Sequence, residues 1–423
     1  MKSLGLLCIS FYFLPLWGNA QLGGFVNKVK SKLNESVDKK IDKKLDKTLG
    51  EPGGKETPDP ATATQTKEKT ESQPNTASFT KYDFVAGEKI LFYNNFQEET
   101  PAELPTGWNT NGTGEITTLE KWPGTWLRLH TPFRYLTDNK TPFGENYTVE
   151  FDVIMQLKNN GWIYPEFLVR LLSTGDEKAD GNNFFKEYNK YASVVAIMHP
   201  GEYKSSKAKL YSFQDNKDYF KSEVKPFGNL EYSYGKPAHF AIQVQKERIR
   251  IWVNEEKLFD VPKAIPQGHV MNQLMFEIGS TNYKEDQYAM YISNIKVATG
   301  KADTRHKLVE EGSFSTSGIL FDVNQASIKP ESMGIVKEIA DVLNKYPGMK
   351  VQIIGHTDAD GNIASNQGLS EQRAAAVKTV LMQEYQVAEE RMKTAGMGSG
   401  KPIADNKTRE GKAINRRVEF VKM

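Results

Sequence analysis

A carboxylate and a guanidinium stand on neighbouring predicted elements in the last quarter of this 423-residue chain. The run Met349–Ile354 is short and rich in β-formers, and Gly355-His356-Thr357-Asp358 follows it. The carboxylate of Asp358 therefore falls at the end of a predicted strand. Apolar residues at helical spacing predict a helix next along the chain, and they are Leu369, Val377, Val380, Leu381 and Tyr385.

Three polar residues share one face of that predicted helix. If the helix begins near residues 362–366, Asn366, Ser370 and Arg373 lie at positions i, i+4 and i+7. A carboxylate and a guanidinium held close together can bind an ammonium and a carboxylate of one ligand. The pattern predicts a binding site for a zwitterion.

Several motifs surround this pair in a fixed order. They are Phe321-Asp322-Val323-Asn324, Gly355-His356-Thr357-Asp358, Asn366, Leu369-Ser370-Glu371-Gln372-Arg373-Ala374 and Asn415-Arg416-Arg417-Val418-Glu419. On these motifs, residues 313–423 resemble the OmpA-like peptidoglycan-binding domain, the module shared by OmpA, Pal and MotB proteins. The resemblance implies an α/β (α+β) domain with a βαβαβ-type sheet and helices.

The same resemblance implies a ligand and a role for each site residue. The family's pocket binds the free end of diaminopimelate in the peptide stem of the cell wall. Asp358 would bind the amino group and Arg373 the carboxylate. The other lining residues would be Asn324, Thr357, Asn366 and Leu369.

Other interpretations of these residues are weaker. The acidic segment after Asp358 resembles part of a calcium loop, but an EF-hand needs a glutamate at its twelfth position, where this chain has Leu369. His356 should point to the opposite face of the strand, and no second His or Cys lies near it in sequence. We expect neither a metal nor another cofactor. Arg416 and Arg417 are interpreted as structural residues that fix neighbouring loops, outside the site.

The first twenty residues have the pattern of a secretory signal peptide. Lys2 precedes an apolar run from Leu4 to Trp17, and Gly18-Asn19-Ala20 ends it, so cleavage would leave Gln21 first. That run is too short to span a membrane as a helix. Cys8, the only cysteine, follows large leucines rather than the small residues of a lipidation site. We expect a periplasmic protein of a Gram-negative-type bacterium, associated with the outer membrane or cell wall.

Residues 21–50 predict an amphipathic helix. Apolar residues recur every four positions, at Phe25, Val29, Leu33, Val37, Ile41, Leu45 and Leu49. Since a helix has 3.6 residues per turn, this stripe drifts by about 40° at each step. Residues 22–49 could contact the outer membrane or an envelope protein, or they could form a solvated helix. Residues 51–80 are rich in Pro and Thr and have no large apolar side chain, which predicts a disordered linker.

Residues 82–300 show short runs of alternating polarity without helical periodicity, typical of an antiparallel β-sandwich. The ten runs are Ile90–Phe92, Trp126–Leu129, Tyr147–Ile154, Phe167–Leu172, Ala192–Met198, Ala208–Phe213, Phe240–Val244, Ile249–Val253, Leu274–Ile278 and Ala289–Val297. The segments 240–262 and 291–297 resemble late strands of the concanavalin A-like or laminin-G-like jelly roll. A membrane β-barrel is disfavoured because charged residues lie within and beside many of the runs. Residues 301–312 would be a second linker.

An enzyme in the sandwich is the alternative function. Glu150-Phe151-Asp152 resembles the start of the three-carboxylate motif of family 16 glycosidases, but Ile154 or Met155 occupies the third position. A glycosidase needs two carboxyl groups flanking the scissile bond. Four tryptophans, Trp108, Trp122, Trp126 and Trp162, could stack on a sugar or belong to the core.

The balance of charges argues against one class of partner. The chain has 55 Lys and Arg against 53 Asp and Glu, a net charge of +2. It therefore lacks the large excess of positive charge that is typical of nucleic-acid-binding proteins. Together the patterns predict a non-enzymatic envelope protein that binds peptidoglycan through residues 313–423. It would display a sandwich that binds a glycan or a protein.

Overall fold

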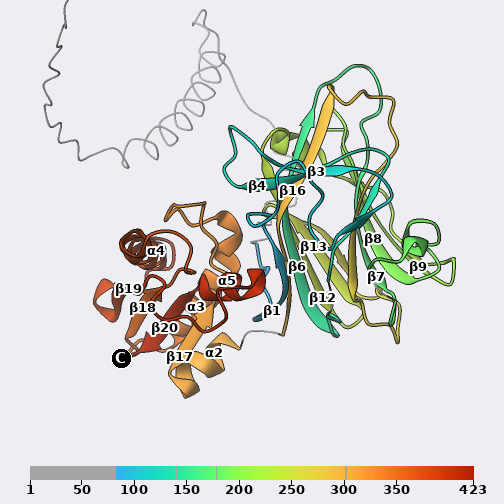
Figure 1. Ribbon diagram of the computed structural model, residues 1–423. Helices are drawn as coiled ribbons and strands as arrows, with labels where there is room; N and C mark the ends of the chain where they lie inside the picture. Colours follow the sequence, from blue (N-terminus) through green and yellow to red (C-terminus); the bar gives the residue numbers. More distant parts are fainter. Residues whose placement is uncertain (1–81, 140, 178, 301–302) are drawn as a thin grey trace, which may run out of the picture. The chain divides into compact units, whose positions relative to one another are not determined.

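A computed structural model describes residues 82–139, 141–177, 179–300 and 303–423. The expected signal peptide, the 21–50 helix and the 51–80 linker lie outside these residues. All described residues belong to one compact unit, Thr76–Met423. Within it, a β-sandwich precedes a smaller α/β domain (Figure 1).

The sandwich consists of two antiparallel sheets of eight strands each. The order in the first sheet is β14 (Glu256–Val261), β13 (Arg248–Val253), β12 (Pro237–Gln245), β6 (Asn146–Leu157), β16 (Tyr288–Thr299), β4 (Thr125–Leu129) and β3 (Gly114–Thr118), and β1 (Lys89–Asn94) also pairs with β16. The order in the second is β10 (Lys217–Lys221), β9 (Lys207–Gln214), β8 (Ala192–His199), β7 (Phe167–Ser173), β15 (Gln273–Ile278), β5 (Arg134–Leu136) and β2 (Asn109–Thr110), with β11 (Lys225–Pro226) beside β9. Two short 3₁₀ helices, Asn182–Phe185 and Gly228–Ser233, lie in the loops.

Strand β6 shows how side-chain alternation builds this core. Val149, Phe151 and Val153 are fully buried between the sheets, and the Phe151 ring stacks on Phe240 with centroids 5.1 Å apart. Glu150 and Asp152 alternate with them, so they point to the outer face of the first sheet.

All ten predicted strands are present, which confirms the prediction of antiparallel sheets. The structure adds the short strands β2, β3, β5, β10 and β11, and also β14, which lies in the segment 240–262 that resembled late jelly-roll strands. Strands of two to five residues are too short to show a reliable alternation in sequence, which explains why they were not predicted.

The C-terminal domain has a four-stranded sheet in the order β17 (Ser313–Thr316), β20 (Val418–Lys422), β18 (Val351–Gly355) and β19 (Met392–Gly396). Its helices are α3 (Met333–Lys345), α4 (Ile363–Gln383) and α5 (Arg409–Asn415), with 3₁₀ turns at Pro330–Ser332 and Glu389–Arg391. Strands β18 and β19 are parallel and joined by α4, whereas β20 pairs antiparallel with β17 and β18. The sheet is therefore mixed, with one βαβ unit, β18-α4-β19, at one edge.

The segment expected to be a linker before this domain carries helical turns. They are α2 (Thr304–His306) and a π-helical turn, Lys307–Glu311. Leu308 is fully buried in the C-terminal hydrophobic core with Phe314 and Phe420. The segment therefore contributes to packing.

Helix α4 is fixed at its start and along its side. The side-chain oxygen of Asn362 accepts hydrogen bonds from the backbone N–H groups of Ala364 (2.8 Å) and Ser365 (3.3 Å), which caps the helix. Gly355, the last residue of β18, lets the helix approach, because a Cβ there would lie 2.1 Å from the Ser370 carbonyl oxygen. This close packing places the polar face of α4 beside the end of β18.

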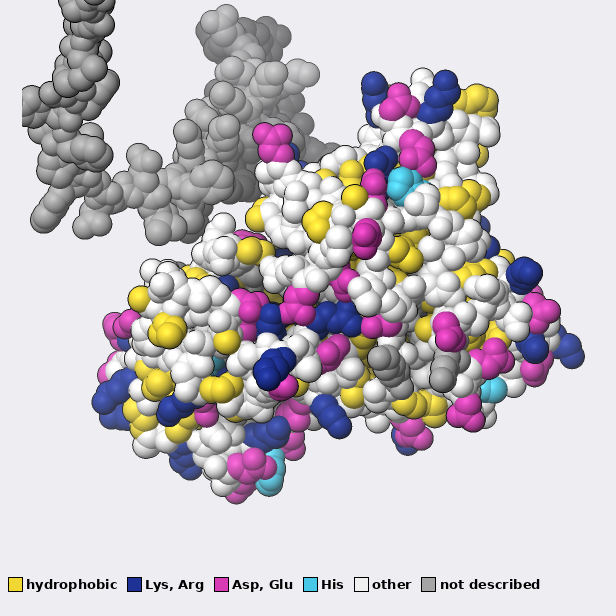
Figure 2. Space-filling view, viewed as in Figure 1, with side chains coloured by type: hydrophobic (Ala, Val, Ile, Leu, Met, Phe, Trp, Pro, Cys, Tyr) yellow, Lys and Arg dark blue, Asp and Glu magenta, His cyan; other side chains and the backbone are white. Residues whose placement is uncertain are grey.

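The sandwich and the C-terminal domain meet along β1 and the residues before it. Phe84 packs on Trp252 of the outer sheet face, and a Cβ on Gly334 of α3 would lie 1.9 Å from the Phe84 carbonyl oxygen. Ile90 of β1 forms a small apolar cluster with Ala298 and with Ala413 of α5. Acidic and basic side chains are mixed along this boundary (Figure 2). Among the described residues, no helix is both long enough and apolar enough to cross a membrane.

Candidate functional site

Asp358 lies three residues after the end of β18, and its side chain is almost fully buried. Its Oδ2 atom lies 2.5 Å from Nη1 of Arg416, and its Oδ1 atom accepts a hydrogen bond from the backbone N–H of Asp360 at 3.1 Å. Both oxygens already have one donor, and each keeps further capacity to accept hydrogen bonds. This carboxylate is held in one orientation.

Arg373 projects from α4 toward the same cavity and is held by a different set of groups. Its Nε atom donates to the Gln325 carbonyl at 3.0 Å, and its guanidinium lies 4.8 Å from the centre of the Phe321 ring. Burial, and then the charge of Arg416, lower the pKa of Arg373 to about 10, so it remains a cation at neutral pH. Neither of these contacts involves Asp358.

The other four predicted residues lie near this pair. Asn366 donates from Nδ2 to the Asp360 carbonyl at 2.8 Å, which ties α4 to the loop after β18. Thr357 donates to the Asp358 carbonyl at 2.8 Å. Asn324 is exposed, with a positive φ of 56°, and Leu369 is half-buried. All six predicted residues line one cavity of about 630 Å³.

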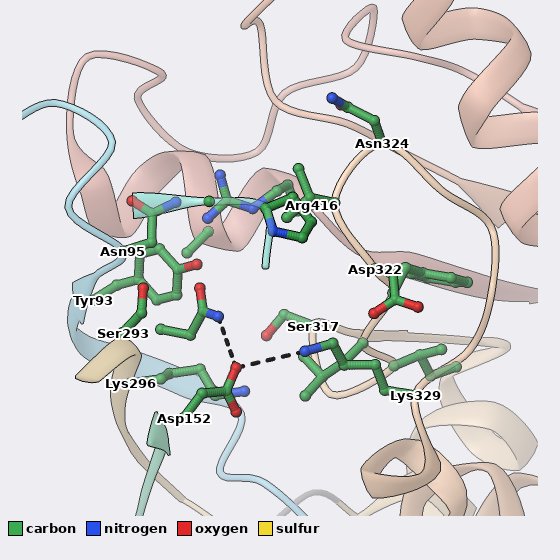
Figure 3. Close-up of a pocket in the computed structure, with 18 of the residues that line it drawn as sticks. Tyr93, Asn95, Asp152, Ser293, Lys296, Ser317, Asp322, Asn324, Lys329 and Arg416 are labelled. Carbon is green, nitrogen blue, oxygen red and sulfur yellow. Dashed lines mark hydrogen bonds and ion pairs between the residues drawn. The ribbon is translucent and has the colours of Figure 1, made fainter. Parts of the chain in front are cut away.

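The sandwich forms the second wall of this cavity. Tyr93 and Asn95 lie at one side beside Arg416, and Asp322, Asn324 and Lys329 lie opposite (Figure 3). Trp122 and Trp126 line it as well, whereas Trp108 belongs to the sandwich core and Trp162 is exposed. Two of the four tryptophans thus face the cavity.

Arg416 was left out of the site by sequence reasoning, and the structure places it against Asp358. Its guanidinium lies 5.0 Å from the centre of the Tyr93 ring, and its Nη2 atom is buried without a hydrogen-bond partner among the described residues. Although burial lowers the pKa of Arg416, Tyr93 and Asp358 raise it on balance. The neighbouring Arg417 does contact a loop, donating to the Lys401 carbonyl at 3.1 Å. The motif alone did not distinguish the two arginines.

A buried cluster of charges closes the cavity on the sandwich side. Glu150 lies 2.6 Å from Nζ of Lys296, and Asp152 lies 2.7 Å from Nδ1 of His239. Lys329 of the C-terminal domain reaches Asp152 at 3.5 Å (Figure 3). The pair of Lys329 with Asp152 therefore joins the C-terminal domain to the sandwich at this side of the cavity.

The pKa values of the cluster follow from these pairs. Burial opposes the charged forms, but Lys296 lowers the pKa of Glu150 and Lys329 lowers that of Asp152. Burial also opposes the His239 cation, yet the hydrogen bond to Asp152 and the nearby Glu150 carboxylate raise its pKa to about 10. The carboxylates and the imidazolium are all charged at neutral pH.

His356 is buried, and its Nε2 atom lies 3.1 Å from Glu419 of β20. Burial, and then Arg417, lower the pKa of His356, which favours the neutral ring. Within the described ranges, no group of three His, Cys, Asp or Glu side chains is arranged to hold a metal ion.

Comparison with known proteins identifies the C-terminal domain. Residues 320–416 match the model of the OmpA family. The chain is 46% identical over 101 residues to outer membrane porin F of Pseudomonas aeruginosa, covering 24% of this chain and 29% of that protein. It is 43% identical over 103 residues to the peptidoglycan-binding protein ArfA of Mycobacterium bovis, covering 24% of this chain and 31% of that protein.

One solved structure is also similar to part of this chain. The peptidoglycan-associated lipoprotein from Burkholderia pseudomallei is 25% identical, with coverage of 29% of this chain and 100% of that chain and a TM-score of 0.25. The chain spans 28% to 31% of the length of the first curated relatives that it matches.

Proposed function

We propose, from the premise of an OmpA-family domain at residues 320–416, that this chain is a non-catalytic envelope protein that binds peptidoglycan. The ligand is the free end of diaminopimelate in the stem peptide, and the C-terminal domain holds it. The sandwich, for which we propose a concanavalin A-like or laminin-G-like jelly roll, is tethered to the cell wall in this way. The protein acts in the periplasm at the outer membrane or wall.

The observation that carries the proposal is the shared cavity of Asp358 and Arg373. A fixed carboxylate and a fixed guanidinium on separate elements match the two charges of an amino-acid end. Asp358 takes the ammonium, and the part of the Arg373 guanidinium not used by the Gln325 and Asp322 carbonyls takes the carboxylate. A relative that is 43% identical over 103 residues, ArfA, is named a peptidoglycan-binding protein.

The rival function, a glycan hydrolase in the sandwich, has less support. A general acid in glycoside hydrolysis needs a carboxyl group with a raised pKa. The pKa values of Glu150 and Asp152 are both lowered, because each faces cations. Ile154 and Met155, at the third position of the motif, are buried. These contacts suit a charge cluster that joins two domains better than a catalytic pair.

The test is sedimentation of the full chain, starting at Gln21, with purified sacculi. We expect the protein to pellet with diaminopimelate-type sacculi and to stay in the supernatant with lysine-type sacculi, whose stem lacks the second carboxylate. Free meso-diaminopimelate should compete. Equal pelleting with both types would contradict the assignment of the diaminopimelate zwitterion as the ligand. Failure to pellet with either type would refute peptidoglycan binding.

A further inference from the structure

We propose that the β-sandwich is part of the peptidoglycan site and binds the stem-peptide residues that adjoin the diaminopimelate end. This inference rests on the proposed function and extends it to a second domain. It concerns Tyr93 and Trp126, which no sequence pattern assigned to that site. Both residues lie more than 200 positions before Asp358 in the chain.

The size of the cavity is the first argument. About 630 Å³ lies within the range of pockets that hold drug-sized ligands, roughly 300–1,000 Å³. One amino-acid end with its ammonium and carboxylate fills a small part of that space. The remainder extends from Asp358 toward the outer face of the first sheet, where Asn95, Trp126 and Ser293 line it.

The second argument is the link between Tyr93 and the aspartate. Tyr93 lies on β1, and its ring supports the Arg416 guanidinium at 5.0 Å. Arg416 in turn bonds to Asp358 at 2.5 Å. A cation over an aromatic face is attracted to it and loses orientational freedom. A sandwich residue thus orients the arginine that orients the ligand-binding carboxylate.

The third argument is the chemistry of the unpartnered atoms. Arg416 and Trp126 both line the cavity, and Nη2 of Arg416 and Nε1 of Trp126 are buried without a hydrogen-bond partner among the described residues. A buried donor without a partner is costly, so such atoms favour a ligand that supplies acceptors. Both groups donate only. A stem peptide presents amide carbonyls and carboxylates next to the zwitterion, and these are the acceptors required.

The contact between the two walls is anchored outside the cavity. Arg409 of α5 lies 3.2 Å from Glu99 and 2.9 Å from Asp138, both in the sandwich. Lys412 of α5 bonds to Glu98 of the sandwich and lies 3.0 Å from Asp360 beside the pocket. The backbone N–H of Tyr93 donates to Glu410 at 3.2 Å. These contacts hold β1 against α5, so the second wall is in place before a ligand binds.

The experiment compares two probes on the full chain by calorimetry. One is free meso-diaminopimelate, and the other is the tripeptide L-alanyl-γ-D-glutamyl-meso-diaminopimelate. The wild-type protein should bind the tripeptide more tightly. Trp126→Phe keeps an aromatic ring and removes the indole N–H. This variant should bind the tripeptide roughly twofold to tenfold more weakly, and its affinity for free diaminopimelate should not change.

Tyr93 is a positioning residue and needs a different readout. Tyr93→Ala should weaken both probes roughly threefold to thirtyfold, because Arg416 loses its support. Tyr93→Phe keeps the ring and should restore most of the affinity. The control is Tyr232→Ala, since Tyr232 is exposed on the sandwich and does not line the cavity. Unfolding curves confirm that each variant is folded.

The outcomes separate this inference from the function on which it rests. If the wild-type protein binds both probes equally and Trp126→Phe changes neither affinity, the sandwich wall is no part of the site, while diaminopimelate binding stands. If the wild-type protein binds neither probe, the proposed function fails as well. Binding of a peptide-free disaccharide that Trp126→Phe weakens would assign the wall to sugar and overturn the peptide assignment.

Discussion

Arg416 lies 2.5 Å from Asp358, the carboxylate expected to bind the ligand's ammonium. The aspartate therefore already has a partner within the protein. An incoming ammonium must share the carboxylate with the arginine, which it can do because each carboxylate oxygen accepts more than one hydrogen bond. The pair holds the Asp358 carboxylate in one orientation and weakens its attraction for a second cation.

Removing either charge of the zwitterion site should abolish binding to sacculi. Asp358→Ala and Arg373→Ala each strand one charge of the ligand in a partly desolvated pocket, with an expected loss of roughly 2–5 kcal/mol. Sedimentation with diaminopimelate-type sacculi measures the loss. Arg373→Lys should fail nearly as badly, because lysine lacks the planar fork that binds a carboxylate through two hydrogen bonds.

The control for these variants is Lys378→Ala on the same helix. Lys378 pairs with the exposed Glu389 at 3.1 Å and does not line the cavity, so this variant should bind as the wild-type protein does. Wild-type affinity in Arg373→Lys would contradict the fork geometry. Wild-type affinity in Asp358→Ala would remove the pocket assignment itself.

Two glycines, one packed against α4 and one within it, should respond in opposite directions to substitution by alanine. Gly355→Ala places a Cβ against the Ser370 carbonyl and should lower the free energy of unfolding by about 1–3 kcal/mol. Gly368→Ala meets nothing within 4 Å and lies inside α4, so it should raise that free energy by up to about 1 kcal/mol. Urea unfolding of both variants checks the pair. Equal effects would contradict the close packing of α4 on β18.

Stability should fall as the pH rises above neutrality, because of His239. Its pKa is about 10 in the folded protein and about 6.5 in an unfolded chain. A raised pKa stabilises the fold fully below about pH 6.5, and this contribution is lost as the pH rises toward 10. The expected slope is about 1.4 kcal/mol per pH unit over much of that interval.

Urea unfolding at several pH values measures this slope, and His239→Gln is the matched variant. It should be less stable near neutrality, because the carboxylates of Asp152 and Glu150 lose a cation. The other charged groups that face this cluster are Lys296, Lys329 and Glu331. Its stability should depend less on pH between 7 and 10. An unchanged slope would show that another group carries the dependence.

The sandwich should release no sugar from polysaccharides. We expect no increase in reducing ends above buffer when the full chain is incubated with a panel of glucans and with peptidoglycan. The reason is that Glu150 and Asp152 are buried and paired with cations. Activity that Glu150→Gln abolished would restore the hydrolase alternative.

Local signals in the sequence predicted much of this molecule. Alternation placed the long strands such as β6 and β16, and helical spacing put Asn366 and Arg373 on one face of α4, which the structure shows beginning at Ile363. The six predicted residues line one cavity, and they lie on α4 and on the segments that follow β17 and β18 in a single domain.

The sequence patterns could not predict which residues of the sandwich contact the C-terminal domain. Tyr93 and Arg416 are more than 300 residues apart, and no local periodicity relates them. Glu150 and Asp152 looked like catalytic carboxylates because a strand pattern shows which face a side chain occupies and does not show what covers that face. His239, Lys296 and Lys329 supply the cover, and they come from two other strands and another domain.

The pairing of β1 with β16 determines how the sandwich would respond to tension. Lys89, where the chain enters the sandwich, lies opposite Thr299, where it leaves, and the two strands run antiparallel. A pull applied across residues 88 and 300 would open this pair from one end, with its hydrogen bonds loaded one after another rather than all at once. Such a geometry yields at low force. In a chain held at the wall by its C-terminal domain and pulled from the other side, β1, the strand that carries Tyr93, would therefore open once the contacts of Phe84 with Trp252 and α3 had parted.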